Sequence, residues 1–136
     1  MKMFYYLFLA VAVIALIACG ENRKPGSHDA FRTVDTREFA ALIDSADVQL
    51  LDVRTQAEYD ESHIKNAAIL DWHMPNNSFI ATAEKMLNKK KTVAIYCRSG
   101  RRSASAAALL STRSFKVVNL GGGIVQWTAD GKPVVK

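Results

Sequence analysis

The stretch TVAIYCRSGRR, residues 92–102, decides the fold. Its first five residues are largely apolar and include β-branched side chains, which favours a buried strand. The segment that follows, Ser103–Thr112, is rich in alanine, the residue with the highest helix propensity. A strand that leads through a short loop into a helix is half of a strand–helix–strand unit, so this stretch predicts parallel strand pairing.

The rest of the chain continues this alternation of strands and helices. Asp35–Glu38 has the form of a capping box, and Phe39, Leu42 and Ile43 follow at helical spacing. The other predicted strands are Val48–Val53, Ala67–Leu70 and Val117–Leu120, and the other predicted helical segments are Thr55–Glu58, Phe79–Leu87 and Ile124–Thr128. In a chain of 136 residues this alternation predicts one layered α/β domain with a parallel sheet.

The amino-terminal residues have the composition of an export signal. Lys2 precedes Phe4–Ala18, an apolar run that is too short for a typical transmembrane helix but fits the apolar region of a secretory signal. The sequence LIACG, residues 16–20, resembles the lipobox of bacterial lipoproteins. The resemblance implies cleavage before Cys19 and attachment of lipid to that cysteine. The alternative is an uncleaved membrane anchor that contains an incidental cysteine.

These features predict three parts of the chain. Residues 1–18 form a lipoprotein signal peptide, residues 19–32 a polar tether with Pro25 and Gly26, and residues 33–136 the folded domain. Both the lipoprotein and the uncleaved anchor place the domain in the cell envelope, outside the cytoplasm. Because Gly20 rather than aspartate follows the cysteine, the resemblance implies a periplasm-facing domain lipid-anchored to the outer membrane.

The charge of the chain is modestly positive. The formal net charge is +5, and removing residues 1–18, whose one charged side chain is Lys2, leaves +4. Such a field favours anionic substrates or an anionic surface. No basic run is interleaved with aromatic residues, so we expect no nucleic-acid partner. The longest basic run, Lys89–Lys91, lies between a predicted helix and a predicted strand and is interpreted as a solvated turn.

Cys97 is the candidate reactive residue. It is the first residue beyond the strand 92–96, and reacting groups of open α/β sheets collect beyond the carboxyl ends of strands. A thiol becomes reactive as the thiolate, whose ordinary pKa is about 8.5. The following helix N-terminus and Arg98, Arg101 and Arg102 should lower that pKa. Gly100 permits a positive φ, so the loop amides can turn inward around a thiolate, a persulfide or a small oxyanion.

Four segments in sequence order resemble one known family. They are CRSGRR at 97–102, LDVR at 51–54 followed by Glu58-Tyr59, HIKNA at 63–67, and Gly121–Gly123 with Trp127. Together they resemble the rhodanese-like sulfurtransferases, although Ser62 stands where the family usually has glycine. The resemblance implies a three-layer fold with a mostly parallel sheet of about five strands and helices on both faces. It also implies that sulfane sulfur moves from a small anionic donor such as thiosulfate, through a Cys97 persulfide, to a thiophilic acceptor such as cyanide or a thiol.

The resemblance and the side-chain chemistry assign roles to the neighbouring residues. Arg98 and Arg101 are predicted to hold the anionic donor, since guanidinium groups match oxyanions geometrically, and the loop amides of Ser99, Gly100, Arg101 and Arg102 to stabilise the persulfide. Arg102 is expected to support the loop or the start of the helix. Asp52 and Arg54 are possible supporting residues, with Arg54 in an ion pair with Glu58. His63 is expected to form hydrogen bonds within the fold, and the three histidines are too scattered for a metal site.

Two other functions remain open at this point. The domain could carry or sense sulfane sulfur, or bind a partner, without turnover. It could also be a cysteine-based phosphatase or arsenate reductase, but tyrosine phosphatases have arginine six positions after the cysteine, where this chain has Ser103. We expect no cofactor, no Cys19–Cys97 disulfide and no oligomer beyond the monomer.

Overall fold

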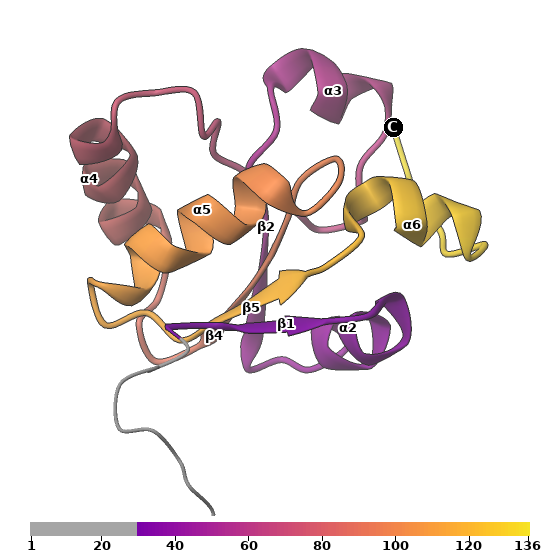
Figure 1. Cartoon of the computed structure of the whole chain (residues 1–136), viewed down its shortest axis with the longest axis horizontal. Coiled ribbons are helices and arrows are strands. Elements are labelled where there is room, and N and C mark those ends of the chain that lie inside the picture. Colours follow the sequence, from indigo (N-terminus) through magenta and orange to yellow (C-terminus); the bar gives the residue numbers. More distant parts are fainter. Residues whose placement is uncertain (1–29) are drawn as a thin grey trace, which may run out of the picture.

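A computed structural model describes residues 30–136 of the chain. Its elements are β1 (Arg32–Val34), α2 (Thr36–Ile43), β2 (Val48–Asp52), α3 (Gln56–Glu61), β3 (Ala68–Ile69), α4 (Asn76–Met86), β4 (Thr92–Tyr96), α5 (Arg101–Ser111), β5 (Val117–Leu120) and α6 (Gly123–Ala129). The five strands form one sheet in the order β1-β5-β4-β2-β3, and every pair is parallel. The predicted α/β class and the parallel sheet are confirmed (Figure 1).

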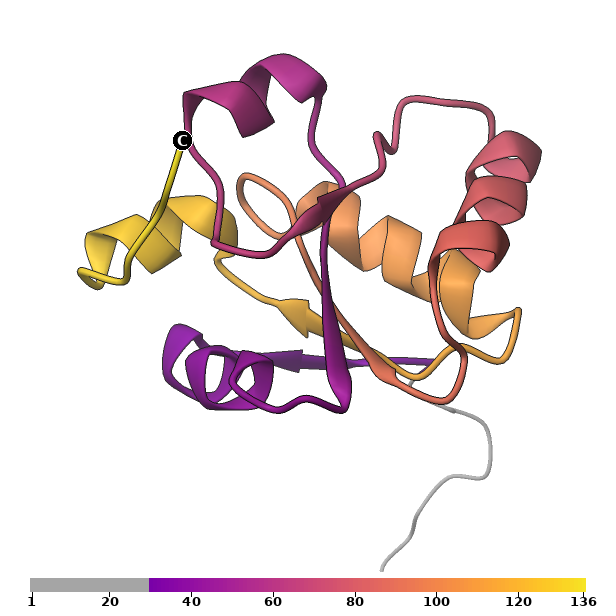
Figure 2. The same ribbon diagram turned by 180° about the vertical axis from the view of Figure 1, so that it is seen from behind.

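Helices cover both faces of the sheet, as the sequence predicted. On one face α4 and α5 bury Phe79, Ala83 and Leu110 against alternate residues of β2, β4 and β5. On the other face α2 and α6 contribute Phe39 and Trp127, whose rings meet edge to face at a centroid distance of 6.1 Å. Figures 1 and 2 show these two layers from opposite sides, with α3 beyond the carboxyl end of the sheet.

The amino ends of α3 and α2 are capped differently. At α3 the box is complete, because the Thr55 side chain accepts from the Glu58 amide and the Glu58 side chain reaches back to the backbone of Thr55. At α2 only half forms: the Asp35 carboxylate accepts from the Glu38 amide at 2.9 Å. The Glu38 carboxylate pairs instead with Arg32, so the prediction of a full box at Asp35 was wrong.

The edge strand β1 was not predicted. It has only three residues and pairs with β5, with Arg32 opposite Val118 and Val34 opposite Leu120. A three-residue strand carries no measurable alternation, and its formation depends on a partner far along the chain. Arg32, the last residue assigned to the tether, therefore belongs to the sheet.

The predicted signal peptide (residues 1–18) and residues 19–29 of the predicted tether, including Cys19, lie outside the described residues. Among residues 30–136, no helix is long and apolar enough to span a bilayer.

Candidate active site

Cys97 lies where β4 ends and the loop to α5 begins. It is 1% exposed and packs among buried residues of the α4–α5 face, including Ile95 and Ala106. The loop is short, since α5 starts at Arg101. In Figure 1 this loop stands at the carboxyl end of the strands, where α/β sheets commonly bind ligands.

Two donors point at the sulfur of Cys97 from the start of α5. The Gly100 amide lies 3.1 Å from Sγ, and the Ser103 hydroxyl lies 3.3 Å from it. Gly100 has φ = 93°, the left-handed conformation that turns its amide inward. Since Ser103 is fully buried, its hydroxyl stays directed at the sulfur.

The backbone of the Cys97 loop packs against the glycine turn 121–123 and the first turn of α6. A Cβ placed on Gly100 would lie 2.2 Å from the carbonyl oxygen of Gly121, so only glycine fits at this contact. The amides of Ile124 and Val125, in the first turn of α6, donate to the carbonyls of Cys97 and Arg98 at 2.9 and 3.1 Å. The loop is thereby fixed in the conformation that surrounds the sulfur.

These contacts shift the pKa of Cys97. Burial is the largest single influence and favours the neutral thiol, but the hydrogen bonds of the Ser103 hydroxyl and of the Ser103, Gly100 and Ser99 amides together outweigh it. The pKa of Cys97 therefore lies below that of an ordinary thiol. The sequence prediction attributed this lowering to the amides of the helix N-terminus and to the three arginines. The amides are among the main causes, together with the Ser103 hydroxyl, and no arginine is.

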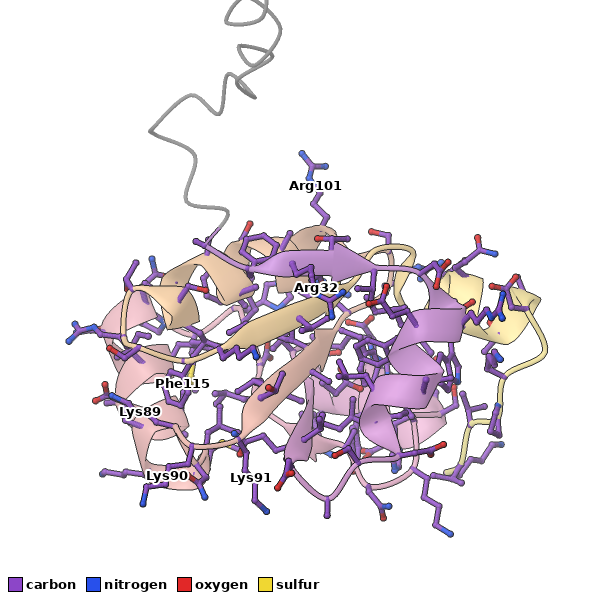
Figure 3. All side chains as sticks on the ribbon, turned by 90° about the horizontal axis from the view of Figure 1, so that it is seen from below. Arg32, Lys89, Lys90, Lys91, Arg101 and Phe115 are labelled. Atoms are coloured by element: carbon purple, nitrogen blue, oxygen red, sulfur yellow. The ribbon has the colours of Figure 1, made fainter. Side chains whose placement is uncertain are left out.

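The three arginines of the loop divide into two kinds. Arg98 and Arg101 are exposed, and Figure 3 shows the Arg101 side chain extending into solvent. Arg102 is partly buried, and its two terminal nitrogens each donate to one carboxylate oxygen of Glu58 at 2.8 Å. This bidentate pair ties α5 to α3 and lowers the pKa of Glu58 to about 2, chiefly through the hydrogen bond from Arg102.

Asp52 and Arg54 form a second, fully buried pair at the end of β2. The Arg54 guanidinium donates to both carboxylate oxygens of Asp52 at 2.7–3.1 Å and to the Ser62 carbonyl at 2.7 Å. The predicted Arg54–Glu58 ion pair is therefore wrong, because Arg54 folds back onto its own strand and Glu58 turns to Arg102. With 4% of its surface exposed, Arg54 supports the loop after α3 and does not face the solvent.

His63 is used within the fold. Its Nδ1 lies 2.9 Å from the carbonyl oxygen of Tyr59, and its ring stacks on the Tyr59 ring at 3.7 Å. Within residues 30–136 no three potential metal-ligating side chains cluster together.

Two residues of the site were missed from the sequence. The first is Ser103, which entered the prediction only as the position where tyrosine phosphatases have arginine. A hydroxyl in the first turn of a helix that follows a candidate cysteine indicates a possible hydrogen-bond donor to the sulfur. Asn119 of β5 is 2% exposed; its Nδ2 donates to the Gly100 carbonyl at 3.4 Å, and its Oδ1 has no protein partner. An amide inside the otherwise apolar strand VVNL could also have drawn attention.

Comparison with known proteins agrees with this geometry. The rhodanese-like domain family matches residues 35–130, which is most of the chain. The chain belongs to the rhodanese-like family. Its relatives include a protein named sulfurtransferase from Allochromatium vinosum, 40% identical over 95 residues that cover 69% of this chain and 84% of that protein. Another is the thiosulfate sulfurtransferase GlpE of Coxiella burnetii, 34% identical over 100 residues covering 73% and 89% of the two chains.

A solved structure gives the same result for the fold. A rhodanese-related protein from Thermoplasma volcanium has a TM-score of 0.67 and 30% identity, covering 77% of this chain and 98% of that one. Family membership and relatives named as sulfurtransferases support sulfur transfer as the general chemistry of this rhodanese-like domain.

Proposed function

We propose that this rhodanese-like protein is a thiosulfate sulfurtransferase that carries sulfane sulfur as a persulfide of Cys97. One observation carries the proposal: the buried Cys97 sulfur accepts hydrogen bonds from the Gly100 amide and the Ser103 hydroxyl, which lower the pKa of the thiol. A sulfur held as an anion by fixed donors is both a nucleophile and a site that stabilises a second sulfur.

The reaction has two steps. In the first, the Cys97 thiolate attacks the outer sulfur of thiosulfate, a new S–S bond forms, and the S–S bond of the donor breaks with its electron pair leaving on sulfite. In the second, a nucleophile such as cyanide or a thiolate attacks the terminal sulfur of the persulfide. Thiocyanate or a new persulfide leaves, and the electron pair of the broken S–S bond returns to Cys97 as the thiolate.

The two exposed arginines are proposed to attract and hold the donor. Arg102 is neutralised by Glu58, so its guanidinium is not free for a ligand. Arg98 and Arg101 both follow Cys97 in the loop, and both are exposed to solvent. A dianionic donor would therefore meet two exposed cations outside the loop and, inside it, the neutral hydrogen-bond donors that surround Cys97.

The pairing of Arg102 also argues against phosphatase chemistry. A phosphoryl group needs a guanidinium that grips its equatorial oxygens, and both terminal nitrogens of Arg102 already donate to Glu58. Position 103 carries a buried serine that donates to the sulfur. A carrier or sensor that forms the persulfide without turnover is the remaining alternative.

We also propose that Cys19 carries lipid and holds the domain at the outer membrane, facing the periplasm. The support is the sequence LIACG at 16–20 after an apolar run. Mass spectrometry of the amino-terminal peptide tests this: cleavage before Cys19 with an acylated cysteine is expected, and an intact Met1–Ala18 segment would contradict it.

Steady-state and single-turnover measurements separate the functions. With thiosulfate alone, intact mass should show one added sulfur on the wild type and none on Cys97→Ser. With thiosulfate and cyanide, thiocyanate should form over many turnovers. A persulfide that forms but is not released to cyanide or thiols supports the carrier, and Cys97-dependent hydrolysis of an aryl phosphate supports the phosphatase.

A further inference from the structure

A group of basic side chains lies at the amino end of the sheet, opposite the Cys97 loop. We define this basic end face by six exposed residues: Lys85, Lys89, Lys90, Lys91, Arg113 and Lys116. The carboxylates of the same end are fewer, namely Asp44, Asp47 and Glu84. Lys89 pairs with Glu84 at 3.2 Å and lies over the Phe115 ring, and no ion pair joins the other five to a carboxylate among the described residues.

The sheet brings these residues together from separate segments. Lys89–Lys91 form the turn before β4, and Lys116 precedes β5. The register places Val93 opposite Val117, and the Val93 amide donates to the Lys116 carbonyl at 2.8 Å, so the two turns are neighbours. In Figure 3 the side chains of Lys90 and Lys91 extend away from the ribbon into solvent.

The chain enters the fold at this same end. Because β1 pairs in parallel with β5, Ala30 and Phe31 lie beside Lys116 and Val117, where they line a common groove. Figures 1 and 2 both show the start of β1 and the turns before β4 and β5 at one end, with the loop after β4 at the other. Ten residues, 20–29, separate Cys19 from Ala30, and a chain of that length spans at most about 35 Å.

We propose that the basic end face docks on an anionic lipid bilayer, with the Cys97 loop directed away from the lipid. The proposal rests on the proposed lipidation of Cys19, which would place the bilayer within reach of Ala30. Lysine and arginine side chains near an anionic leaflet are attracted to it, and this attraction falls off within a Debye length. A lipid anchor and a basic patch on the same end act together, so the domain is held in one orientation instead of turning freely.

This orientation has a consequence for the proposed reaction. The exposed residues of the Cys97 loop, Arg98, Ser99 and Arg101, lie beyond the carboxyl end of β4, remote from the basic end face, and we call them the mouth of the site. If the mouth faced the bilayer, an anionic donor would have to approach through a layer of negative headgroups. Docking by the opposite end leaves the mouth open to solutes of the aqueous compartment.

Hydrogen–deuterium exchange of the full lipidated chain in vesicles tests the docking. The vesicles contain phosphatidylcholine alone or phosphatidylcholine with phosphatidylglycerol as the anionic lipid. We expect exchange in segments 87–92 and 112–117 to slow several-fold only with the anionic lipid, and to recover when salt is raised. Exchange in segment 98–103 should be the same in both vesicles.

Two variants with equal loss of charge make the test specific. The variant Lys89→Gln/Lys90→Gln/Lys91→Gln should abolish the protection, whereas Arg37→Gln/Lys65→Gln/Lys136→Gln, exposed residues on other parts of the surface, should retain it. Equal exchange in the two vesicles, or equal loss in both variants, would overturn the proposal. Protection of segment 98–103 instead would also overturn it, because the active-site end would then face the lipid.

The exchange readout does not depend on turnover, so an inactive but protected protein would refute the sulfurtransferase function while leaving the docking intact. If a chain without lipid on Cys19 showed the same lysine-dependent protection, the docking would be supported and the proposed lipid anchor would be refuted. If exchange slowed with added DNA or an acidic protein but did not slow with anionic vesicles, the basic end face would bind another partner and the proposed docking on lipid would be refuted.

Discussion

The two ends of this sheet use charge in opposite ways. At the carboxyl end, two ion pairs are fixed within the fold: Asp52 with Arg54 is fully buried, and Glu58 with Arg102 is partly buried. At the amino end, six cationic side chains are exposed and only Lys89 is paired. The two ion pairs need fixed geometry and hold the elements that carry Cys97, whereas exposed charges have freedom and act through their summed field. The paired charges at the first end therefore position the Cys97 loop, whereas the exposed charges at the second end are free to attract an anionic surface.

The largest effect is expected from breaking the buried pair at Asp52. The substitution Arg54→Met leaves the Asp52 carboxylate buried without its cationic partner, with the backbone amide of residue 54 still donating to it, and removes the donor to the Ser62 carbonyl. We expect a loss of about 3–5 kcal/mol in the free energy of unfolding. Urea unfolding measures it, with Arg37→Met as the exposed control, which should change by less than about 0.5 kcal/mol. Similar losses in the two variants would show that the pair is not the source.

The second largest effect is expected on activity, from a substitution that moves the Cys97 loop while the rest of the domain stays folded. In Gly100→Ala the new Cβ meets the Gly121 carbonyl oxygen, so the loop must move and the amide must leave the sulfur. Thiocyanate formation should fall about 100-fold or more. The control is Gly131→Ala, which also has a positive φ (73°) but meets nothing within 4 Å, and it should keep normal turnover at a cost of about 1 kcal/mol in stability. Equal activity in the two variants would mean that the loop contact is not required.

A smaller effect is expected from the hydroxyl that faces the sulfur. Ser103→Ala removes one of the donors that lower the pKa of Cys97, so that pKa should rise. The pH profile of Cys97 alkylation should shift toward higher pH, and turnover near neutral pH should fall about tenfold. Ser105→Ala, on the exposed side of the same helix, is the matched control. A turnover loss without any shift of the alkylation profile would indicate a role other than thiolate stabilisation.

The Glu58–Arg102 pair predicts an acid-dependent part of the stability. Because the pKa of Glu58 is lowered from 4.5 to about 2 in the folded chain, the pair stabilises the fold above about pH 4.5, and this stabilisation is lost as pH falls toward 2. The pair is partly exposed, so we expect a contribution of about 1 kcal/mol. Between neutral pH and pH 3, Glu58→Gln should lose less stability than the wild type, whereas Glu61→Gln on the same helix should behave like the wild type. An unchanged acid dependence in Glu58→Gln would refute this assignment.

The sequence predicted the segment around Cys97, whose signals are local, and missed the edge strand β1, which depends on a partner far along the chain. The strand 92–96, the cysteine after it, the glycine of the loop and the alanine-rich helix are contiguous, so their relation could be read directly. The strand β1 depends on pairing with β5, more than 80 residues away in register, and three residues carry no pattern of their own. Local spacing therefore sufficed to predict the strand, loop and helix around Cys97 but not the edge of the sheet.

The choice of ion-pair partner shows the same limit at the scale of single residues. The sequence predicted an ion pair between Arg54 and Glu58, which are four residues apart in the chain. The actual partner is Arg102, 44 residues away, which reaches Glu58 only because α3 and α5 meet beyond the carboxyl end of the sheet. No pattern within a short window distinguishes these two arginines. Ser103 was different, because its position in the first turn of the helix was visible and only its role was overlooked.

The smallest effect is expected from the basic end face on the binding of thiosulfate, and it is measured by comparing substitutions at the two ends of the sheet. Replacing Lys89, Lys90 and Lys91 by glutamine removes three charges, and Arg98→Gln/Arg101→Gln removes only two. The five residues of β4 separate the lysine turn from Cys97 by about 17 Å, which exceeds the Debye length of about 8 Å at physiological salt. In detergent solution the lysine variant should therefore change the half-saturating thiosulfate concentration less than about twofold, whereas the arginine variant should raise it about tenfold through lost charge-assisted contacts. If the lysine variant had the larger effect, thiosulfate would be attracted by the net charge of the domain, and the separation of roles between the two ends would be wrong.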